Sequence, residues 1–274
     1  MQLELIRSIT DLRVPALAFA NARSLTRQIH LHVGPTNSGK THGALVTLSR
    51  ARTGMYAGPL RLLAHEVWER MNQGTISPGI PPRACNLRTG EEVRTVDEYA
   101  GLVSCTVEMA DVTRPYDVAV IDEIQMIADP QRGFAWTHAV LGLPAKELHL
   151  CGEASTVPLI QHLAKLCGDD LHVHNYERLT PLHVAPHSLY GDLGKVQRGD
   201  CIVAFKRSTI FRLKEQIEAR TGLQCALAYG ALPPETKSEQ AKLFNAGKLD
   251  VMVASDAIGM GLNLRCLLYT SPSP

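Results

Sequence analysis

The stretch Gly34-Pro35-Thr36-Asn37-Ser38-Gly39-Lys40-Thr41 fits the pattern G-x-x-x-x-G-K-[ST], which is typical of a loop that binds nucleotide phosphates. Its two glycines allow sharp turns that aim backbone N–H groups at phosphate oxygens. A strand is predicted over residues 29–33 and a helix over 39–50, so the positive end of the helix dipole faces the phosphates. The charge of Lys40 suits β- and γ-phosphates, and the Thr41 hydroxyl suits magnesium.

A second acidic motif completes the predicted nucleotide site. Asp122-Glu123 directly follows a predicted strand over 117–121. Its residues Val118 to Ile121 are all apolar, which is typical of a strand buried on both faces. Asp122 is expected to hold magnesium through water, and Glu123 to orient and deprotonate the attacking water. An acidic pair favoured only by a helix dipole is the alternative. The position after a strand, downstream of the phosphate loop, favours catalysis with ATP and Mg²⁺.

The rest of the chain alternates strand and helix patterns, which predicts an α/β fold of the P-loop type: parallel sheets covered by helices. Prolines and glycines interrupt this pattern before residue 200. A second series of strands and helices follows, but it is too short to form a sheet as large as that of the first domain. We therefore expect a lead-in segment (1–28), a first α/β domain (29–180), a linker (181–199), a partial second α/β domain (200–265) and a tail of doubtful origin (266–274).

Composition limits the remaining classes of function. The net charge of +1 gives no basic excess, so nucleic acid must be held by local sites, and 5% aromatic residues leave little base stacking. Seven scattered cysteines without a C-x-x-C argue against a disulfide framework or a cysteine zinc site. His30 and His32 are interpreted as sheet residues rather than ligands. His65-Glu66 lacks the second histidine of a metalloprotease helix. No apolar run is long enough for a membrane span.

Further motifs resemble those of superfamily-two helicases, in the required order. Asp122-Glu123-Ile124-Gln125 resembles motif II, with Gln last. The others are Gly58-Pro59-Leu60-Arg61, Thr89-Gly90-Glu91, Thr106-Val107-Glu108, Leu150-Cys151-Gly152-Glu153-Ala154-Ser155, Phe205-Lys206-Arg207-Ser208 and the segment from Ala254 to Asn263. The resemblance implies that Gln125 joins Lys40 and Glu123 in catalysis and that Asp256 and Gly259 contact ATP. It also implies nucleic-acid binding by Arg61, Gly90, Glu91, Thr106, Arg207 and Ser255.

The closest resemblance is to the Suv-type family of mitochondrial degradosome RNA helicases. The similar segments are His32 to Thr41, Gly58 to Ala64, Val107 to Ala110, Ile121 to Met126 and Tyr229 to Thr236. The resemblance implies that 29–180 is a RecA-like domain and 200–265 a partial second RecA-like domain. It also implies ATP-driven 3′-to-5′ unwinding of RNA and of some DNA duplexes, by contact with single-stranded and duplex RNA. It also implies an exoribonuclease partner and a mitochondrial matrix location, with the nucleus as a further compartment and no membrane association.

Two departures from the family pattern lead to a further expectation. Motif VI, with its arginines, would lie beyond Arg265. The family's C-terminal domains and most of its N-terminal region are likewise not matched by residues 1–274. An arginine finger contributes about 10³–10⁵ in rate. We therefore expect residues 1–274 to bind ATP but hydrolyse it slowly. The alternatives are a thymidine-kinase-like phosphotransferase, which needs no second α/β series, and a non-catalytic, nucleotide-gated RNA-binding module.

Overall fold

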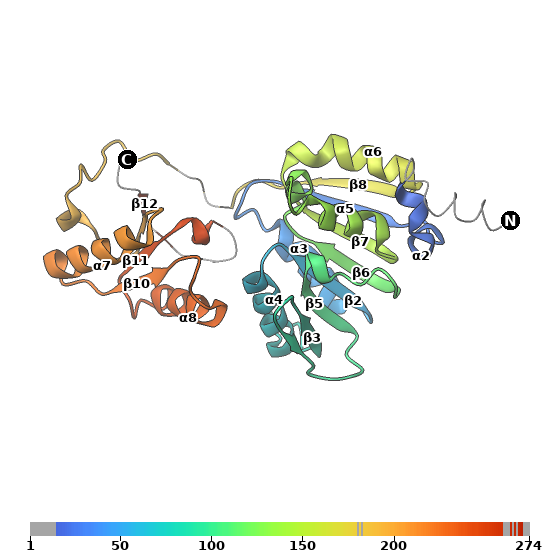
Figure 1. Cartoon of the computed structure of the whole chain (residues 1–274), viewed down its shortest axis with the longest axis horizontal. Helices are drawn as coiled ribbons and strands as arrows, with labels where there is room; N and C mark the ends of the chain where they lie inside the picture. The colour runs from blue at the N-terminus through green and yellow to red at the C-terminus, as the bar shows by residue number, and fades with distance from the viewer. Residues whose placement is uncertain are drawn as a thin grey trace. The chain divides into compact units, whose positions relative to one another are not determined.

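The computed structural model describes residues 15–179, 181, 183–259, 264, 266 and 268–270. The chain divides into two compact units, Met1–Pro181 and Leu182–Pro274 (Figure 1). The predicted boundary between domain 1 and the linker therefore lies within one or two residues of the division between the units. Each unit is built around its own parallel sheet, as the alternating pattern predicts.

The first unit contains one sheet whose strands come from the whole length of the unit. Its strands are β1 (Gln28–Val33), β2 (Gly54–Gly58), β3 (Cys85–Arg88), β4 (Val93–Arg94), β5 (Leu102–Thr106), β6 (Tyr116–Ile121), β7 (Ala145–Gly152) and β8 (Asp170–Asn175). They lie in the order β4-β3-β5-β2-β6-β7-β1-β8. All neighbours are parallel except β3 and β4. The loops that follow the parallel strands therefore meet at one edge, where ligands of open α/β sheets bind.

Helices cover both faces of this sheet (Figure 1). On one face, α3 (Lys40–Arg50) and α4 (Arg61–Gln73) pack their apolar residues on Tyr56, Val118 and Val120. On the other, α5 (Gly133–Gly142) and α6 (Val157–Cys167) pack on alternate residues of the same strands, including Ile121. The burial of Val118 to Ile121 on both sides explains why that strand has no polar face.

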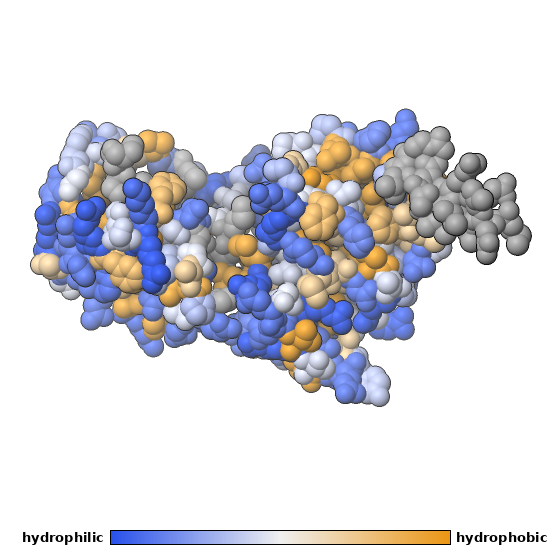
Figure 2. Space-filling view, viewed as in Figure 1, coloured by the Kyte–Doolittle hydropathy of each residue, from blue (hydrophilic) through white to orange (hydrophobic). Residues whose placement is uncertain are grey.

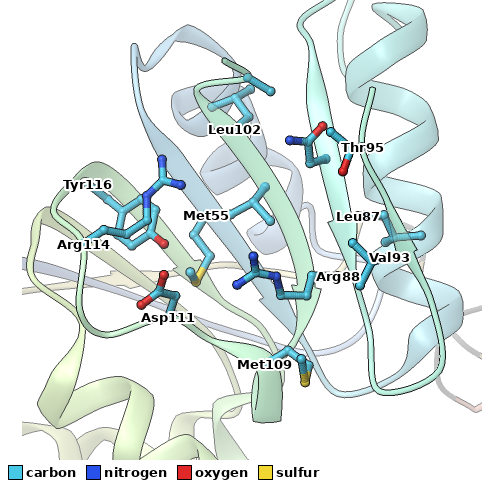
Figure 3. A pocket seen from close by; sticks show the side chains of 13 residues that line it. Met55, Leu87, Arg88, Val93, Thr95, Leu102, Met109, Asp111, Arg114 and Tyr116 are labelled. Atoms are coloured by element: carbon cyan, nitrogen blue, oxygen red, sulfur yellow. The ribbon is translucent and has the colours of Figure 1, made fainter. Parts of the chain in front are cut away.

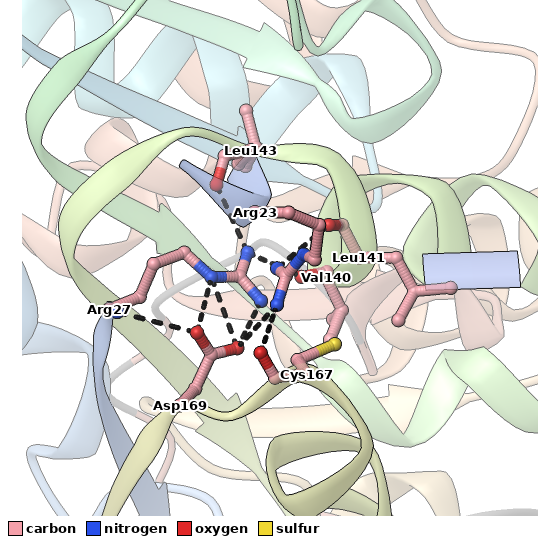
Figure 4. Close-up of polar contacts among 7 residues, drawn as sticks. All are labelled: Arg23, Arg27, Val140, Leu141, Leu143, Cys167 and Asp169. Atoms are coloured by element: carbon pink, nitrogen blue, oxygen red, sulfur yellow. Dashed lines mark hydrogen bonds and ion pairs between the residues drawn. The ribbon is translucent and has the colours of Figure 1, made fainter. Parts of the chain in front are cut away.

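A buried ion pair fixes the lead-in segment to the first unit. After the turn η1 (Pro15–Ala18) and the short helix α2 (Ala20–Arg23), Arg27 binds Asp169 through two side-chain nitrogens, Nη2 to Oδ2 at 2.5 Å and Nε to Oδ1 at 3.1 Å (Figure 4). Arg27 also donates to the carbonyls of Val140 and Leu143, at 2.8 and 3.0 Å. Because all these groups are buried, the guanidinium holds the start of β1 against the ends of α5 and α6.

The second unit has a four-stranded parallel sheet in the order β10-β11-β9-β12. Its strands are β9 (Asp200–Val203), β10 (Cys225–Ala228), β11 (Val251–Ala254) and β12 (Leu268–Thr270), and its helices are α7 (Arg207–Thr221) and α8 (Pro234–Asn245). The two helices cover opposite faces, with Ile210 and Ile217 in one core and Phe244 in the other. Val196, in the predicted linker, is buried in the α7 core.

Three strands were not expected from the sequence: β3, β4 and, within the predicted tail, β12. They are two to four residues long, too short to show a period. Strand β5 ends at Thr106, and the 3₁₀ turn η2 (Val107–Met109) follows. Further turns are η3 (Ile124–Ala128), η4 (Ala154–Thr156), η5 (Leu193–Lys195) and η6 (Asp256–Ile258). None of the helices described here has the length and apolar character of a membrane span.

Candidate functional site

The glycine-rich loop leaves β1 at the carboxyl edge of the first sheet and runs into α3. Asn37 and Gly39 have φ values of 57° and 81°, in the left-handed region, so the chain makes a compact turn before the helix begins at Lys40. The first turn of α3 has backbone donors that no helical carbonyl accepts. Lys40 is only 8% exposed, and its Nζ donates to the Pro35 carbonyl at 3.2 Å, so its charge lies inside the loop.

Asp122 directly follows β6, which lies two strands from β1 in the sheet, and its side chain contacts the start of α3 after the glycine-rich loop. Its Oδ1 accepts from the Thr41 hydroxyl at 3.1 Å and from the Glu123 N–H at 3.0 Å. Its Oδ2 accepts from the Tyr56 hydroxyl at 3.0 Å. Burial, and then the charge of Glu123, raise the pKa of Asp122 to about 6. A divalent cation would stabilise the buried carboxylate, and the Thr41 hydroxyl beside it is a second oxygen ligand of the kind Mg²⁺ takes.

Glu123 has a backbone that few glutamates adopt, with φ 51° and ψ 52°. Such strain persists only where the surroundings impose it. Here the Gln125 side chain donates from Nε2 to Glu123 Oε2, and the Trp136 indole donates to the Asp122 carbonyl at 3.0 Å. Both contacts hold the turn after β6, so the carboxylate of Glu123 has a defined direction. Gln125, which the resemblance assigns to the site, thus contacts Glu123, and its catalytic role stays a prediction.

The local geometry fits a bound nucleotide. Ser38 Oγ and Gln125 Oε1 are buried and have no hydrogen-bond partner among the described residues. Buried polar atoms normally have a partner, so both are available to a ligand at the loop. A Cβ on Gly34 would lie 2.6 Å from the Tyr176 carbonyl, which only glycine tolerates. The described residues can therefore hold a triphosphate and Mg²⁺ at one edge of the sheet.

Several residues of the site gave no signal in the sequence. Tyr56 lies in a fully buried strand and looks like a core residue, but its hydroxyl bonds Asp122. Trp136 lies on α5, and its indole N–H holds the same turn. Arg178 donates to the carbonyl and the hydroxyl of Thr36, both at 3.0 Å, from the loop after β8. These contacts join residues far apart in the chain, so no local pattern reveals them.

The predicted nucleic-acid residues of the first unit follow β2, β3 and β5. The guanidinium of Arg61 forms an ion pair with Glu91, and both side chains are largely exposed. Gly90 is exposed and has no heavy atom within 4 Å of where a Cβ would lie. Thr106 is buried at the end of β5. Of the four predicted residues, Arg61 and Glu91 are therefore in direct contact, and the Glu91 carboxylate neutralises the charge of Arg61.

The remaining predicted residues belong to the second unit and follow its central strands. The Arg207 guanidinium lies 5.0 Å from the ring centre of Tyr229 and 5.7 Å from that of Phe211. Ser255 is buried, and its N–H donates to the Ala228 carbonyl at 2.8 Å. Asp256 and Gly259 are exposed at the turn η6, where the Gly259 N–H donates to the Asp256 carbonyl.

A separate small pocket opens between β2, β3 and β5 (Figure 3). Its lining includes Met55, Arg88, Asp111, Arg114 and Tyr116, none of which belongs to the nucleotide site. Elsewhere, the face seen in Figure 2 mixes hydrophilic and hydrophobic residues, with the hydrophilic ones in the majority. We therefore assign the nucleotide site from the side chains at the glycine-rich loop and not from this pocket.

A RecA-like sheet, a glycine-rich loop after its first strand and an Asp-Glu-x-Gln turn beside that loop define the class of superfamily-two helicase domains. Residues 15–176 match the family described as the DEXQ-box helicase domain of Suv3, and residues 185–269 match the helicase conserved C-terminal domain. The chain belongs to the Suv3 DEXQ-box helicase family.

Relatives of known identity support this assignment. The mitochondrial ATP-dependent RNA helicase SUV3L of Oryza sativa subsp. japonica is 50% identical over 263 residues, which are 95% of this chain and 35% of that protein. The mitochondrial ATP-dependent RNA helicase SUPV3L1 of Homo sapiens is 49% identical over 277 residues, 98% of this chain and 34% of that protein. The chain thus spans about a third of the length of these relatives.

A solved structure shows the same fold at lower identity. The helicase Lhr of Mycobacterium smegmatis, bound to ssDNA and AMP-PNP, has a TM-score of 0.60 and 18% identity. The likeness covers 98% of this chain and 43% of that one. The two RecA-like domains that the family resemblance implies are therefore confirmed.

Proposed function

We propose that this chain is the ATP-hydrolysing motor of a mitochondrial ATP-dependent RNA helicase. The observation that carries the proposal is the junction of Thr41, Asp122 and Glu123 at the end of the glycine-rich loop. The names of the relatives supply RNA as the substrate and the mitochondrion as the compartment. Segments 29–180 and 200–265 are the two motor domains in this proposal.

Each residue of the nucleotide site has a role in the proposed reaction. Bound ATP with Mg²⁺ supplies the transferable phosphoryl group and neutralises its charge. Residues 34–41 bind the phosphates, and Lys40 stabilises negative charge that develops during transfer. Thr41 and Asp122 hold the magnesium. Glu123 accepts the proton of the attacking water, and Gln125 keeps its carboxylate in position.

The RNA-binding role is assigned to polar residues that follow the strands of each unit. Arg61, Thr106, Arg207 and Ser255 are proposed to contact phosphates and riboses, which makes binding independent of sequence. Gly90 and Glu91 are placed beside Arg61 in this scheme, and Asp256 and Gly259 are proposed to contact ATP. Differential affinity for RNA in the ATP-bound and ATP-free states would drive 3′-to-5′ movement. An exoribonuclease partner of a degradosome complex would degrade the unwound strand.

The proposal is tested by nucleotide binding and single-turnover hydrolysis of Mg²⁺-ATP, with and without single-stranded RNA. Glu123→Gln should retain ATP binding and lose hydrolysis, whereas Lys40→Ala should lose binding. Glu98→Gln, an exposed acid outside the site, is the matched control. A chain that does not bind Mg²⁺-ATP, or whose hydrolysis survives Glu123→Gln, contradicts the proposal.

The same assay separates the alternatives. Transfer of phosphate to a nucleoside would indicate a thymidine-kinase-like enzyme. ATP-dependent RNA binding without any turnover would indicate a nucleotide-gated binding module. Slow hydrolysis by residues 1–274 alone stays a prediction, and single-turnover conditions are chosen so that a slow rate can be measured.

A further inference from the structure

Five histidines lie on one face of three adjacent strands, and the nucleotide site uses none of them. His30 and His32 on β1 lie between His149 on β7 and His172 and His174 on β8, the strand at the sheet edge. Their rings form a stack, with His32 and His149 at 8° and His30 and His149 at 20° between planes. Imidazole is the commonest metal ligand in proteins. Two His-x-His pairs on neighbouring strands therefore need an explanation beyond sheet packing.

A chain of hydrogen bonds orients the central ring of this cluster. His32 Nδ1 lies 2.9 Å from the Tyr176 hydroxyl, and His32 Nε2 lies 2.9 Å from His149 Nδ1. His149 is only 5% exposed. Its other ring nitrogen, Nε2, is buried and has no hydrogen-bond partner in the described part of the chain. It faces Glu147, whose Oε2 lies 3.5 Å away.

What lies between His149 Nε2 and Glu147 Oε2 decides the proton positions in this chain. With a proton on Nε2, the ring donates to Glu147 and its Nδ1 accepts from His32. With the proton on Nδ1, donated to His32, Nε2 presents a lone pair to a carboxylate oxygen. Two acceptors facing each other in a buried position repel unless a cation lies between them. Metal-binding histidines typically donate their second N–H to a neighbouring acceptor, which is the role His32 has here.

The distances match a particular kind of cation. Ligands at about 2.0–2.2 Å from a tetrahedral zinc ion lie about 3.3–3.5 Å apart. The separation of His149 Nε2 and Glu147 Oε2 is 3.5 Å. One nitrogen of His30 completes a group whose ligand atoms all lie within 4.8 Å of one another. His30 is half-buried, and its ring supplies the third ligand atom of this group.

We propose that His30, Glu147 and His149 form a binding site for a divalent transition metal ion of the zinc class. Two histidines and one carboxylate are a ligand set that zinc uses with a fourth position open to water. His174, with Nε2 3.2 Å from His30 Nδ1, orients the His30 ring as His32 orients His149. The site is separate from the magnesium position at Thr41, and it does not depend on the proposed helicase function.

The kind of ligand also selects the ion. Imidazole with one carboxylate suits Zn²⁺, Co²⁺ and Ni²⁺ better than Mg²⁺, which prefers oxygen ligands.

The bound ion would also act on the glycine-rich loop. Tyr176 ends the hydrogen-bond chain that starts at His149, and its N–H donates to the Val33 carbonyl at 2.8 Å. The Tyr176 carbonyl packs so closely on Gly34 that a Cβ there would be 2.6 Å away. A metal that fixes the protons of His149 and His32 therefore also fixes the segment that packs on the loop.

The experiment is a calorimetric titration of the metal-free chain with Zn²⁺, followed by a Co²⁺ titration in visible light. One ion should bind per chain. Loss of a residue that only hydrogen-bonds to a metal ligand typically weakens metal binding about 10–100-fold. Because Glu147 and His30 are proposed as ligands themselves, Glu147→Gln and His30→Ala should each weaken Zn²⁺ binding by more than that. His172→Gln, on the same face but outside the ligand set, should leave the affinity unchanged, and Mg²⁺ should not compete.

Three results would overturn the proposal. The first is the absence of Zn²⁺ binding to a folded chain. The second is unchanged binding in both Glu147→Gln and His30→Ala. The third is a thiolate charge-transfer band in the Co²⁺ spectrum, which would place the ion on cysteines. Glu147 is 43% exposed, so Glu147→Gln keeps the fold, and circular dichroism of each variant checks this.

Discussion

The buried pair of Arg27 and Asp169 offers a quantitative test of the fold that positions the glycine-rich loop. Both side chains are 0% exposed. Asp169→Ala removes the acceptor of two side-chain nitrogens of Arg27 and leaves its charged guanidinium in the protein interior, where the carbonyls of Val140 and Leu143 still accept from it. It also removes the carboxylate that lies 3.6 Å from Arg23. Breaking a buried pair from one side costs about 3–5 kcal/mol. In a unit of this size, each kcal/mol lowers Tm by about 2–4 °C.

The expected result for Asp169→Ala is therefore a Tm lower by about 6–20 °C in a calorimetric scan of the chain, in the transition of the first unit. Lys146→Ala is the matched control, because Lys146 forms an ion pair of 2.8 Å with Asp117 but is 69% exposed. Such exposed pairs contribute about 0–1 kcal/mol. The double change Arg27→Met with Asp169→Leu should recover much of the loss. Equal effects of Asp169→Ala and Lys146→Ala would refute the reasoning.

Three further predictions concern the two ligand-binding regions. Gly34→Ala brings a Cβ within 2.6 Å of the Tyr176 carbonyl, so it should lower the free energy of unfolding by about 1–3 kcal/mol and weaken ATP binding. Thermal unfolding and ATP titration measure the two effects. Gly90→Ala has open space around the new Cβ and should change neither quantity. Glu91→Gln frees the Arg61 guanidinium from its ion pair, so it should tighten RNA binding and steepen the salt dependence of the affinity in fluorescence titrations. Weaker binding would instead show that Glu91 contributes to RNA binding. Tyr56→Phe removes a hydrogen bond to Asp122 and should raise the Mg²⁺ concentration needed for ATP binding, and an unchanged Mg²⁺ titration would contradict this.

Much of the fold could be read from local patterns. The strand before Gly34, the helix after it and the buried strand before Asp122 all show their period within ten or so residues, and the structure has each of them. The glycine-rich motif is equally local, since its glycines and Lys40 act within one turn of the chain. The loop and the acidic turn could therefore be assigned to nucleotide binding without coordinates.

Contacts between distant segments could not be read in this way. Strand order, which brings Asp122 to Thr41, depends on packing of whole faces and not on any local residue. Tyr56 reads as a core residue, and only its place beside Asp122 makes it part of the site. Arg61 and Glu91 look like two independent RNA contacts, yet they neutralise each other.

The histidines show the same limit most clearly. In the sequence, His30 alternates with apolar residues and looks like an ordinary strand position. Register places it opposite His149, beside Glu147, and the side chains of three strands then share one face. Local periodicity is set by backbone geometry within one element, so the sequence alone shows the elements and the phosphate loop. Which side chains meet across strands is set by the burial of both sheet faces, and only the tertiary structure decides it.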